Sequence, residues 1–302
     1  MATQLNENIK IDPSKEVQSF ADVRIKLHCC RYWKLREWEF NDMAFPFWRL
    51  YYNSIEGANI NYENKCTYLT SDKIIIIPPN TSFSTSLTTK KSNIRSESII
   101  GERISNINEM SVLKEKRMVD HFFIHFNLGI LHDNLKPGIY TFPVEQVQIS
   151  LINSIKKEII KDFRQINFAA TLQINTLIFS VIESTLPEFW QIRRVDPRVT
   201  LILNYIESHT GEKLTNPELA SKANMASNSF LRLFKENTGS PLQEYIQRRR
   251  IEKASVSLHH SSESIDDIAL KYGFCDRYHF SKTFKKVMKI SPAKYKQKLA
   301  MI

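Results

Sequence analysis

Two short stretches in the last third of the chain carry polar side chains at a spacing that suits contact with nucleic-acid bases. In the first, a helical spacing of i, i+3, i+4 and i+7 places four side chains on one face: Asn228, Leu231, Arg232 and Lys235. The second repeats the arrangement, with Arg277 beside Tyr278, Ser281, Lys282 and Lys285. A guanidinium can form two hydrogen bonds to guanine, a side-chain amide can do so to adenine, and an exposed leucine can contact a thymine methyl.

These stretches predict which residues touch DNA and in what way. We expect base contacts from the following residues: Asn228, Leu231, Arg232, Arg277, Tyr278, Ser281 and Lys282. Phosphate contacts are expected from lysines further along the same two helices, namely Lys235, Lys285 and Lys286. Each residue alone is as well explained as an ordinary exposed polar group, so the repetition carries the prediction.

The elements that must position these residues are helices joined by short turns. Asn216 is a suitable N-cap with Pro217 at the first helical position, and that helix should end near Lys222. The next helix begins at Ser227, and a long helix should span residues 242 to about 259. Ser264 and Asp276 then cap a second pair of helices. Two units of about 25 residues, each a short helix, a turn and a second helix, predict a double helix-turn-helix domain.

The run RIEKASVSLHHSSESIDDIALKYGFCDRYHFSKTFKKVMKISPAKY, residues 250–295, resembles the signature region of the AraC/XylS (arabinose-regulator) family. Leu219-Ala220 and the stretch FLRLFK at 230–235 agree with the family in the first unit. The resemblance implies a seven-helix domain over residues 196–302 whose two recognition helices enter successive major grooves. It also implies base-reading positions that coincide with those named above, and a transcription regulator, more often an activator, that works with RNA polymerase.

The first half of the chain is rich in strand patterns over residues 20–142. The stretches FWRLYY at 47–52 and HFFIHF at 121–126 combine aromatic and β-branched residues, and four isoleucines at 74–77 precede two prolines. Residues 85–119 are polar and suggest a long loop. Residues 47–83 and 122–129 resemble strands of a cupin-type β-barrel, which implies an effector domain. Candidate effector contacts are Trp48, Arg49, Tyr51, Tyr52 and His125.

The predicted fold class is therefore α+β and multidomain. Apolar residues at helical spacing predict two helices within residues 143–195, which either pack on the β domain or form a homodimer interface. Pro187 to Pro197 suits a linker, and the boundary is placed near Val195. The expected domains are thus a β-rich region 1–142, a helical segment 143–195 and a DNA-binding domain 196–302.

Metal and catalytic sites are not expected. The β-rich half contains no HxH pair, and the neighbouring His121, His125 and His132 are more typical of packed or surface groups. The four cysteines lack CxxC spacing and are expected to be buried free thiols. We therefore predict no cofactor and no enzyme, although an enzyme fused to a DNA-binding domain is one alternative, and an architectural protein that binds DNA without an effector is another.

Charge and hydropathy support DNA as the partner. Residues 196–302 hold 18 Lys and Arg against 11 Asp and Glu, and so contain most of the net charge of +10. Such an excess favours binding to a polyanion. The amino terminus resembles no secretory signal and no apolar run approaches ~20 residues, so a cytoplasmic protein without a membrane partner is expected. A small molecule or a protein partner could act at the first half.

Overall fold

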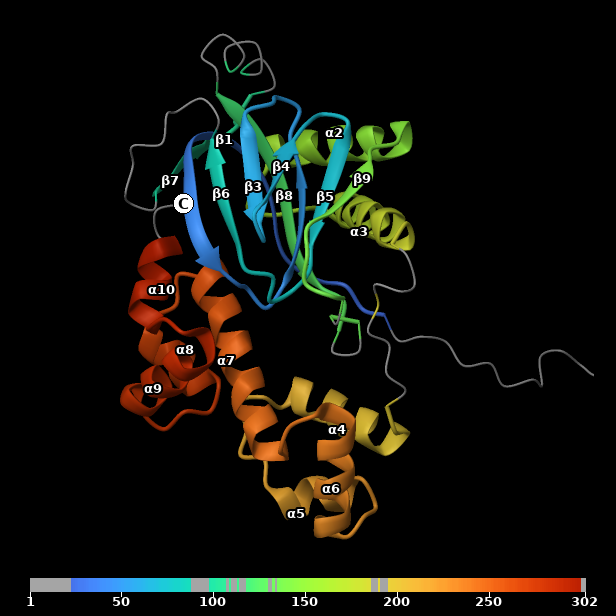
Figure 1. The fold of residues 1–302 in the computed structure, drawn as a ribbon, viewed down its shortest axis with the longest axis vertical. Helices are drawn as coiled ribbons and strands as arrows, with labels where there is room; N and C mark the ends of the chain where they lie inside the picture. The colour runs from blue at the N-terminus through green and yellow to red at the C-terminus, as the bar shows by residue number, and fades with distance from the viewer. Residues whose placement is uncertain are drawn as a thin grey trace, which may run out of the picture.

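A computed structural model describes residues 23–87, 98–106, 118–129, 132–133, 135–185 and 195–299, together with residues 109, 113 and 190. The first half is a curled antiparallel sheet with helices on one face (Figure 1). Its strands are β1 (Lys26–Met43), β2 (Trp48–Tyr52), β3 (Ala58–Tyr62), β4 (Lys65–Leu69), β5 (Lys73–Ile77), β6 (Phe83–Leu87), β7 (Ser98–Arg103), β8 (Val119–Asn127) and β9 (Tyr140–Pro143).

The sheet has the strand order β4-β3-β6-β1-β8-β2-β5-β9, and β7 also pairs with β1. The long β1 makes this curl possible, since it pairs first with β8, then with β7 and finally with β6. The four isoleucines of β5 are all buried and the strand ends before Pro78, as the sequence predicts. The prediction of a loop across residues 85–119 is wrong where β6 continues to Leu87 and where β7 pairs with β1.

Strand alternation divides the buried side chains of the sheet into two sets. On β2, Trp48, Leu50 and Tyr52 join the core beneath the helices, whereas Arg49 and Tyr51 face a cavity inside the curl. On β1, odd-numbered residues line the cavity as far as Leu35, and even-numbered residues do so from Trp38 onward. The register of β1 shifts between Leu35 and Glu37, which explains the change of face.

Two helices cover the outer face of the sheet, α2 (Gln146–Lys161) and α3 (Phe168–Glu183) (Figure 1). Their buried isoleucines share a core with the even-numbered residues of β2 and β8. Lys156 of α2 reaches the fully buried Asp120 of β8 at 3.3 Å. Packing on the sheet, one of the two roles expected for these helices, is thus observed, while Phe168 and Leu172 on α3 remain exposed.

The second half is helical, and most of the predicted boundaries are confirmed. Its helices are α4 (Pro197–Ser208), α5 (Asn216–Lys222), α6 (Ser227–Thr238), α7 (Leu242–His260), α8 (Ile265–Lys271), α9 (Arg277–Met288) and α10 (Pro292–Leu299). Ser264 and Asp276 cap α8 and α9 as predicted. The cap of α5 is Thr215, not Asn216, because the Thr215 hydroxyl accepts from the Glu218 N–H. None of the described helices has the length and apolar character needed to span a membrane.

The two helix-turn-helix units differ in what they pack against. The first unit, α4 to α6, closes its own core around Phe230 and Phe234, together with Tyr245 from the start of α7. The second unit, α8 to α10 with the end of α7, shares one continuous core with the inner face of the sheet. The ring of Tyr295 lies 5.9 Å from that of Phe45 and 5.4 Å from that of Phe284. In Figure 1 the second unit therefore lies against the sheet, whereas the first lies away from it.

Candidate functional site

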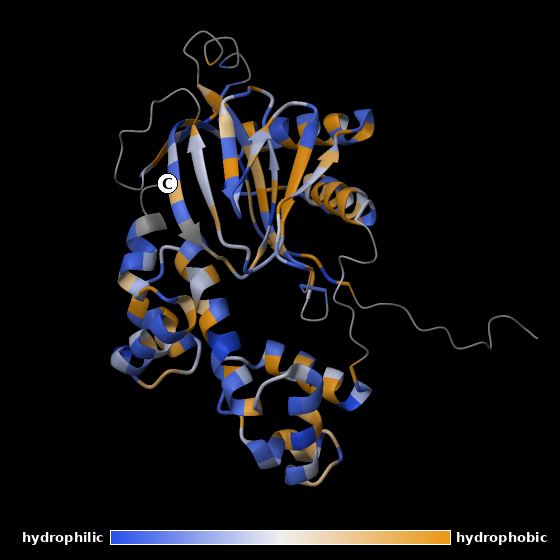
Figure 2. Ribbon diagram, in the orientation of Figure 1, coloured by the Kyte–Doolittle hydropathy of each residue, from blue (hydrophilic) through white to orange (hydrophobic). Residues whose placement is uncertain are grey.

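The second helix of each unit presents a polar face to solvent, and Figure 2 shows hydrophilic residues on the outside of both units. On α6, Asn228, Arg232 and Lys235 are exposed, while Phe230 and Phe234 are buried. Leu231 differs from the expectation, because it is only partly exposed and packs against the core of the first unit. The burial of part of its side chain reduces the apolar surface that it can offer to a thymine methyl.

Helix α9 repeats this layout. Tyr278 is 80% exposed, and the other exposed members of the face are Arg277, Lys282, Lys285 and Lys286, while Ser281 is half-buried. The Arg277 guanidinium bonds the Asp266 carboxylate on α8 at 3.0 Å, and both side chains remain accessible. Asp266 thereby orients the Arg277 guanidinium at the exposed surface of the second unit.

A partly buried polar network joins the two units through α7. Arg249 bonds Glu207 of α4 at 3.0 Å. Burial raises the pKa of the Glu207 carboxyl, but Arg249 and Lys253 together outweigh burial and lower it. Arg250 donates to the carbonyl oxygens of Thr210 and Gly273, at 2.9 and 3.0 Å. Because a guanidinium has a fixed fork of donors, these contacts set the spacing between the two units.

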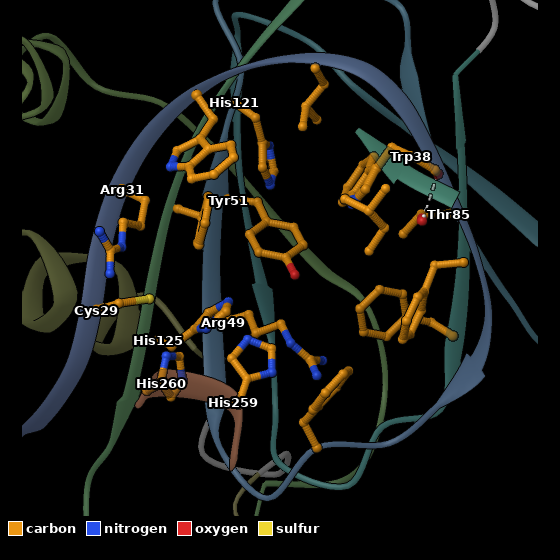
Figure 3. Close-up of a pocket in the computed structure, with 17 residues that line it drawn as sticks. Cys29, Arg31, Trp38, Arg49, Tyr51, Thr85, His121, His125, His259 and His260 are labelled. Atoms are coloured by element: carbon orange, nitrogen blue, oxygen red, sulfur yellow. Dashed lines mark hydrogen bonds between the residues drawn. The ribbon is translucent and has the colours of Figure 1, made fainter. Parts of the chain in front are cut away.

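The cavity inside the curled sheet has a volume of about 250 Å³. Strands β1, β2, β6, β7 and β8 form most of its wall, and His259 and His260 from the end of α7 complete it. Figure 3 shows Arg49, His125, His259 and His260 gathered at one end, with Trp38, Tyr51 and His121 toward the other. The sheet and the helical second half thus share one cavity.

The structure brings together three of the five residues proposed from the sequence as effector contacts, because Arg49, Tyr51 and His125 all line the cavity. Trp48 and Tyr52 lie on the opposite face of β2, where Trp48 donates to Asp133 and Tyr52 to the carbonyl of Ser71. Strand alternation excludes both from this cavity.

Comparison with known proteins adds independent information on the second half. The family model of a helix-turn-helix domain matches residues 219–298. The Transposon Tn10 TetD protein of Escherichia coli is 38% identical over 96 residues, which make up 32% of this chain and 70% of TetD. The chain belongs to the AraC/XylS family of transcription regulators.

Other relatives align over the same region. The transcriptional activator RhaS of Citrobacter koseri is 35% identical over 102 residues, 34% of this chain. The match spans only 37% of RhaS. A solved structure from Chromobacterium violaceum, described as a transcriptional regulator with an AraC-type DNA-binding domain, is 28% identical and covers 34% of this chain and 93% of its own, with a TM-score of 0.33.

In this AraC/XylS regulator, burial controls the protonation of the cavity histidines. Burial lowers the pKa of His121 to about 3, and it lowers the pKa of His259 to about 3. Burial also holds the pKa of His125 well below its ordinary value, assisted by nearby positive charge. These imidazoles are therefore neutral at physiological pH, and a neutral imidazole has one donor and one acceptor nitrogen. In His121, Nδ1 is already bonded to the side chain of Asn53 at 2.8 Å.

A group of possible metal ligands lies at the same end of the cavity. Ligand atoms of Cys29, His125 and His260 all lie within 4.8 Å of one another. Burial raises the pKa of the Cys29 thiol to about 12, and the guanidinium groups of Arg31 and Arg49 line the same cavity. Positive charge and a protonated thiol both disfavour a cation here.

The prediction that the cysteines are buried is wrong for Cys66 and Cys275, which are exposed.

Sequence reasoning missed the contribution of α7 to the regulator's cavity. His259 and His260 follow a helical pattern in a segment assigned to DNA binding, 130 residues or more from the strands that they face. Adjacent histidines at a helix end are the only local signal. Only the tertiary structure shows that these two histidines face the sheet.

Proposed function

We propose that this protein is a sequence-specific DNA-binding transcription activator whose DNA binding responds to an effector in the cavity. The main support is the pair of repeated helix-turn-helix units, each presenting an exposed polar face on its second helix. The two recognition helices read bases in successive major grooves, and Lys235, Lys285 and Lys286 contact phosphates. The name of one relative, the transcriptional activator RhaS, supports activation. We propose that activation works with RNA polymerase and by binding without catalysis.

The division of labour follows the expected domain limits. Residues 1–142 form most of the effector site, residues 143–195 support this domain, and residues 196–302 bind DNA and contribute His259 and His260 to the cavity. The shared core of the second unit and the sheet supports communication between them. An effector that changes this contact changes the orientation of one recognition helix relative to the other.

Replacing Arg232 or Arg277 by Ala tests base reading. We expect wild-type protein to select from a random pool a site with two blocks about 10 base pairs apart. Each variant should lose preference at one block only, by about 10- to 100-fold, because a bidentate arginine–guanine contact contributes ~1–3 kcal/mol of discrimination. Affinities are measured at one stated salt concentration, since phosphate contacts are salt-dependent.

Arg198→Ala is the matched control, because Arg198 is an exposed arginine of α4 that pairs with Asp196 outside both recognition helices. It should leave both blocks unchanged. If wild-type protein selects no motif with or without an added effector, the chain is an architectural DNA-binding protein and base reading is wrong. If Arg232→Ala weakens DNA affinity equally for all sequences, Arg232 contacts a phosphate and not a base.

We also propose that two copies pair through α3. Phe168 is 78% exposed and Leu172 is 50% exposed, and both lie on the side of α3 that faces away from the sheet core. Leu172→Glu should shift the protein to the monomer in sedimentation velocity, because a charge replaces apolar surface at the contact. Leu201→Glu changes an exposed leucine of α4 and is the control, which should not shift the protein to the monomer. Equal self-association of both variants and wild type would reject α3 as the interface.

A further inference from the structure

The cavity contains a buried cation without a counter-charge. Arg49 is 1% exposed, and neither of its terminal nitrogens has a hydrogen-bond partner among the described residues. Its guanidinium lies 4.1 Å from the centroid of the Phe45 ring and 4.8 Å from that of Phe83. The described residues that line the cavity include no Asp or Glu. A buried charge left unpaired is strongly unfavourable, so binding of an anion beside Arg49 would offset the free-energy cost of burying its charge.

Three imidazole nitrogens near Arg49 also lack hydrogen-bond partners within the part of the chain that the structure describes. They are Nδ1 of His125, Nδ1 of His259 and Nε2 of His260, and all are buried. The His125 ring lies 5.3 Å from that of His259 and 5.2 Å from that of His260. A neutral imidazole can donate a hydrogen bond to a carboxylate oxygen that Arg49 leaves free. Figure 3 shows all four side chains at one end of the cavity.

The two halves of this anion site come from different domains. Arg49 and His125 lie on β2 and β8, whereas His259 and His260 end α7, which runs into the second helix-turn-helix unit. An anion bonded by both sets would hold α7 against the sheet. Its binding energy would therefore stabilise one orientation of the second recognition helix.

The rest of the wall determines what the anion is attached to. It is mainly aromatic, with Trp33, Trp38, Phe40, Tyr51, Phe83 and Phe123. The volume of about 250 Å³ is below the range of about 300–1,000 Å³ typical of sites for drug-sized ligands. A single carboxylate on a small apolar body matches both the unpaired cation and these walls.

We propose that the effector is a small monocarboxylate with an aromatic or aliphatic body, whose carboxylate pairs with Arg49 and is hydrogen-bonded by His259 or His260. The inference rests on the proposed function, because it names the class of effector for the same cavity. On binding, the carboxylate links the sheet to α7 and fixes the second unit.

Titration calorimetry of the full chain with 3-phenylpropionate and octanoate tests the anion site, with the uncharged primary amide of each acid as its matched probe. We expect each acid to bind about 10- to 100-fold more tightly than its amide, since hydrogen bonds to charged groups contribute about 1.5–3 kcal/mol. Equal affinity of acid and amide would overturn the proposal. So would binding of both acids weaker than about 1 mM.

Arg49→Met provides a variant that remains folded, because methionine removes the unpaired charge and keeps much of the volume. It should have a melting temperature at or above that of wild type and should lose the preference for acid over amide. Arg36→Met is the matched control, since Arg36 is an exposed arginine of β1 that pairs with Glu102. A clear drop in the melting temperature of Arg49→Met with the acid preference retained would make Arg49 a structural residue only.

Two further readouts separate this inference from the proposed function. Bound acid should slow hydrogen exchange of the α7 amides in wild type and not in Arg49→Met. If acid binds through Arg49 and leaves DNA affinity unchanged, the anion site stands and effector control of DNA binding fails. If the amides alter DNA affinity as much as the acids do, effector control stands and the carboxylate proposal fails. Binding of Zn²⁺ alone by wild type and Arg49→Met, with no acid bound, would assign the histidines and Cys29 to a metal.

Discussion

Phe284→Ala is expected to destabilise the sheet as well as the second helix-turn-helix unit. Phe284 is fully buried, and its cluster runs without a break from α9 through Tyr295 to Phe45 and the inner face of the sheet. Removing a buried phenylalanine leaves a cavity and costs about 3–5 kcal/mol. The loss should therefore appear in the unfolding of both halves, even though the substitution lies in the DNA-binding domain.

Phe234→Ala is the matched control, because Phe234 occupies the corresponding position in the first unit and is also fully buried. Its cluster includes Phe230 and Tyr245 and is separate from the sheet core. All four tryptophans lie between residues 33 and 190, so their fluorescence reports unfolding of the first half alone, while far-ultraviolet circular dichroism reports the helices. Phe284→Ala should lower the urea midpoint by both signals, and Phe234→Ala by circular dichroism only. An unchanged fluorescence midpoint in Phe284→Ala would show that the shared core does not couple the halves.

Stability should also fall as the pH is lowered from 7.5 to 5.5. Burial holds the folded-state pKa of His121 and of His259 at about 3, and that of His125 well below 6.5. Below pH 6.5 the unfolded chain binds protons at these histidines that the folded chain does not bind, so the free energy of unfolding decreases. At pH 5.5 each histidine contributes a loss of about 1.4 kcal/mol.

One buried carboxyl opposes this trend. Burial raises the pKa of Asp133 to about 6, so the folded state binds a proton there before the unfolded state does as the pH falls. This offsets roughly 0.8 kcal/mol at pH 5.5, so these three histidines and Asp133 together give a net loss of about 3 kcal/mol. Burial also lowers the pKa of His28 and of His260, which adds to the loss. Urea unfolding followed by tryptophan fluorescence at several pH values measures it. His259→Phe should reduce the slope of the free energy of unfolding against pH by the equivalent of one proton. A slope near zero for wild type between pH 7.5 and 5.5 would contradict the burial of neutral histidines.

The helical half was predictable in detail because its signals are local. Ser264, Asp276 and Gly239 end or begin helices through contacts within three or four residues, and the Phe280 and Phe284 pair follows the helical repeat. The N-cap of α5 is an exception: Asn216 was predicted and Thr215 is observed. The two residues are adjacent, and both types of side chain can cap a helix. Leu231 is less exposed than expected, because helical spacing identifies a face but not how far a neighbouring core extends over it.

The sheet was less predictable because strands pair across long separations. Strand β7 was read as loop, since its partner β1 lies some 60 residues earlier and its own pattern is weak. Every residue of β2 except Leu50 was a candidate for the effector site, and the buried pattern of the strand does not reveal which face points inward. Only the pairing of β2 with β8 and β5 assigns Arg49 and Tyr51 to the cavity and Trp48 and Tyr52 to the helices.

The sequence by itself determined the double helix-turn-helix domain, the family and the candidate base-reading face, because helix caps and helical periodicity act over a few residues. Tertiary structure alone decided that the two units are unequal, with the second sharing a core with the sheet and the first closing its own. It also decided that His259 and His260 meet Arg49 and His125 in one cavity. These contacts join residues more than 130 positions apart, and their energy depends on burial and charge that exist only after the chain has folded.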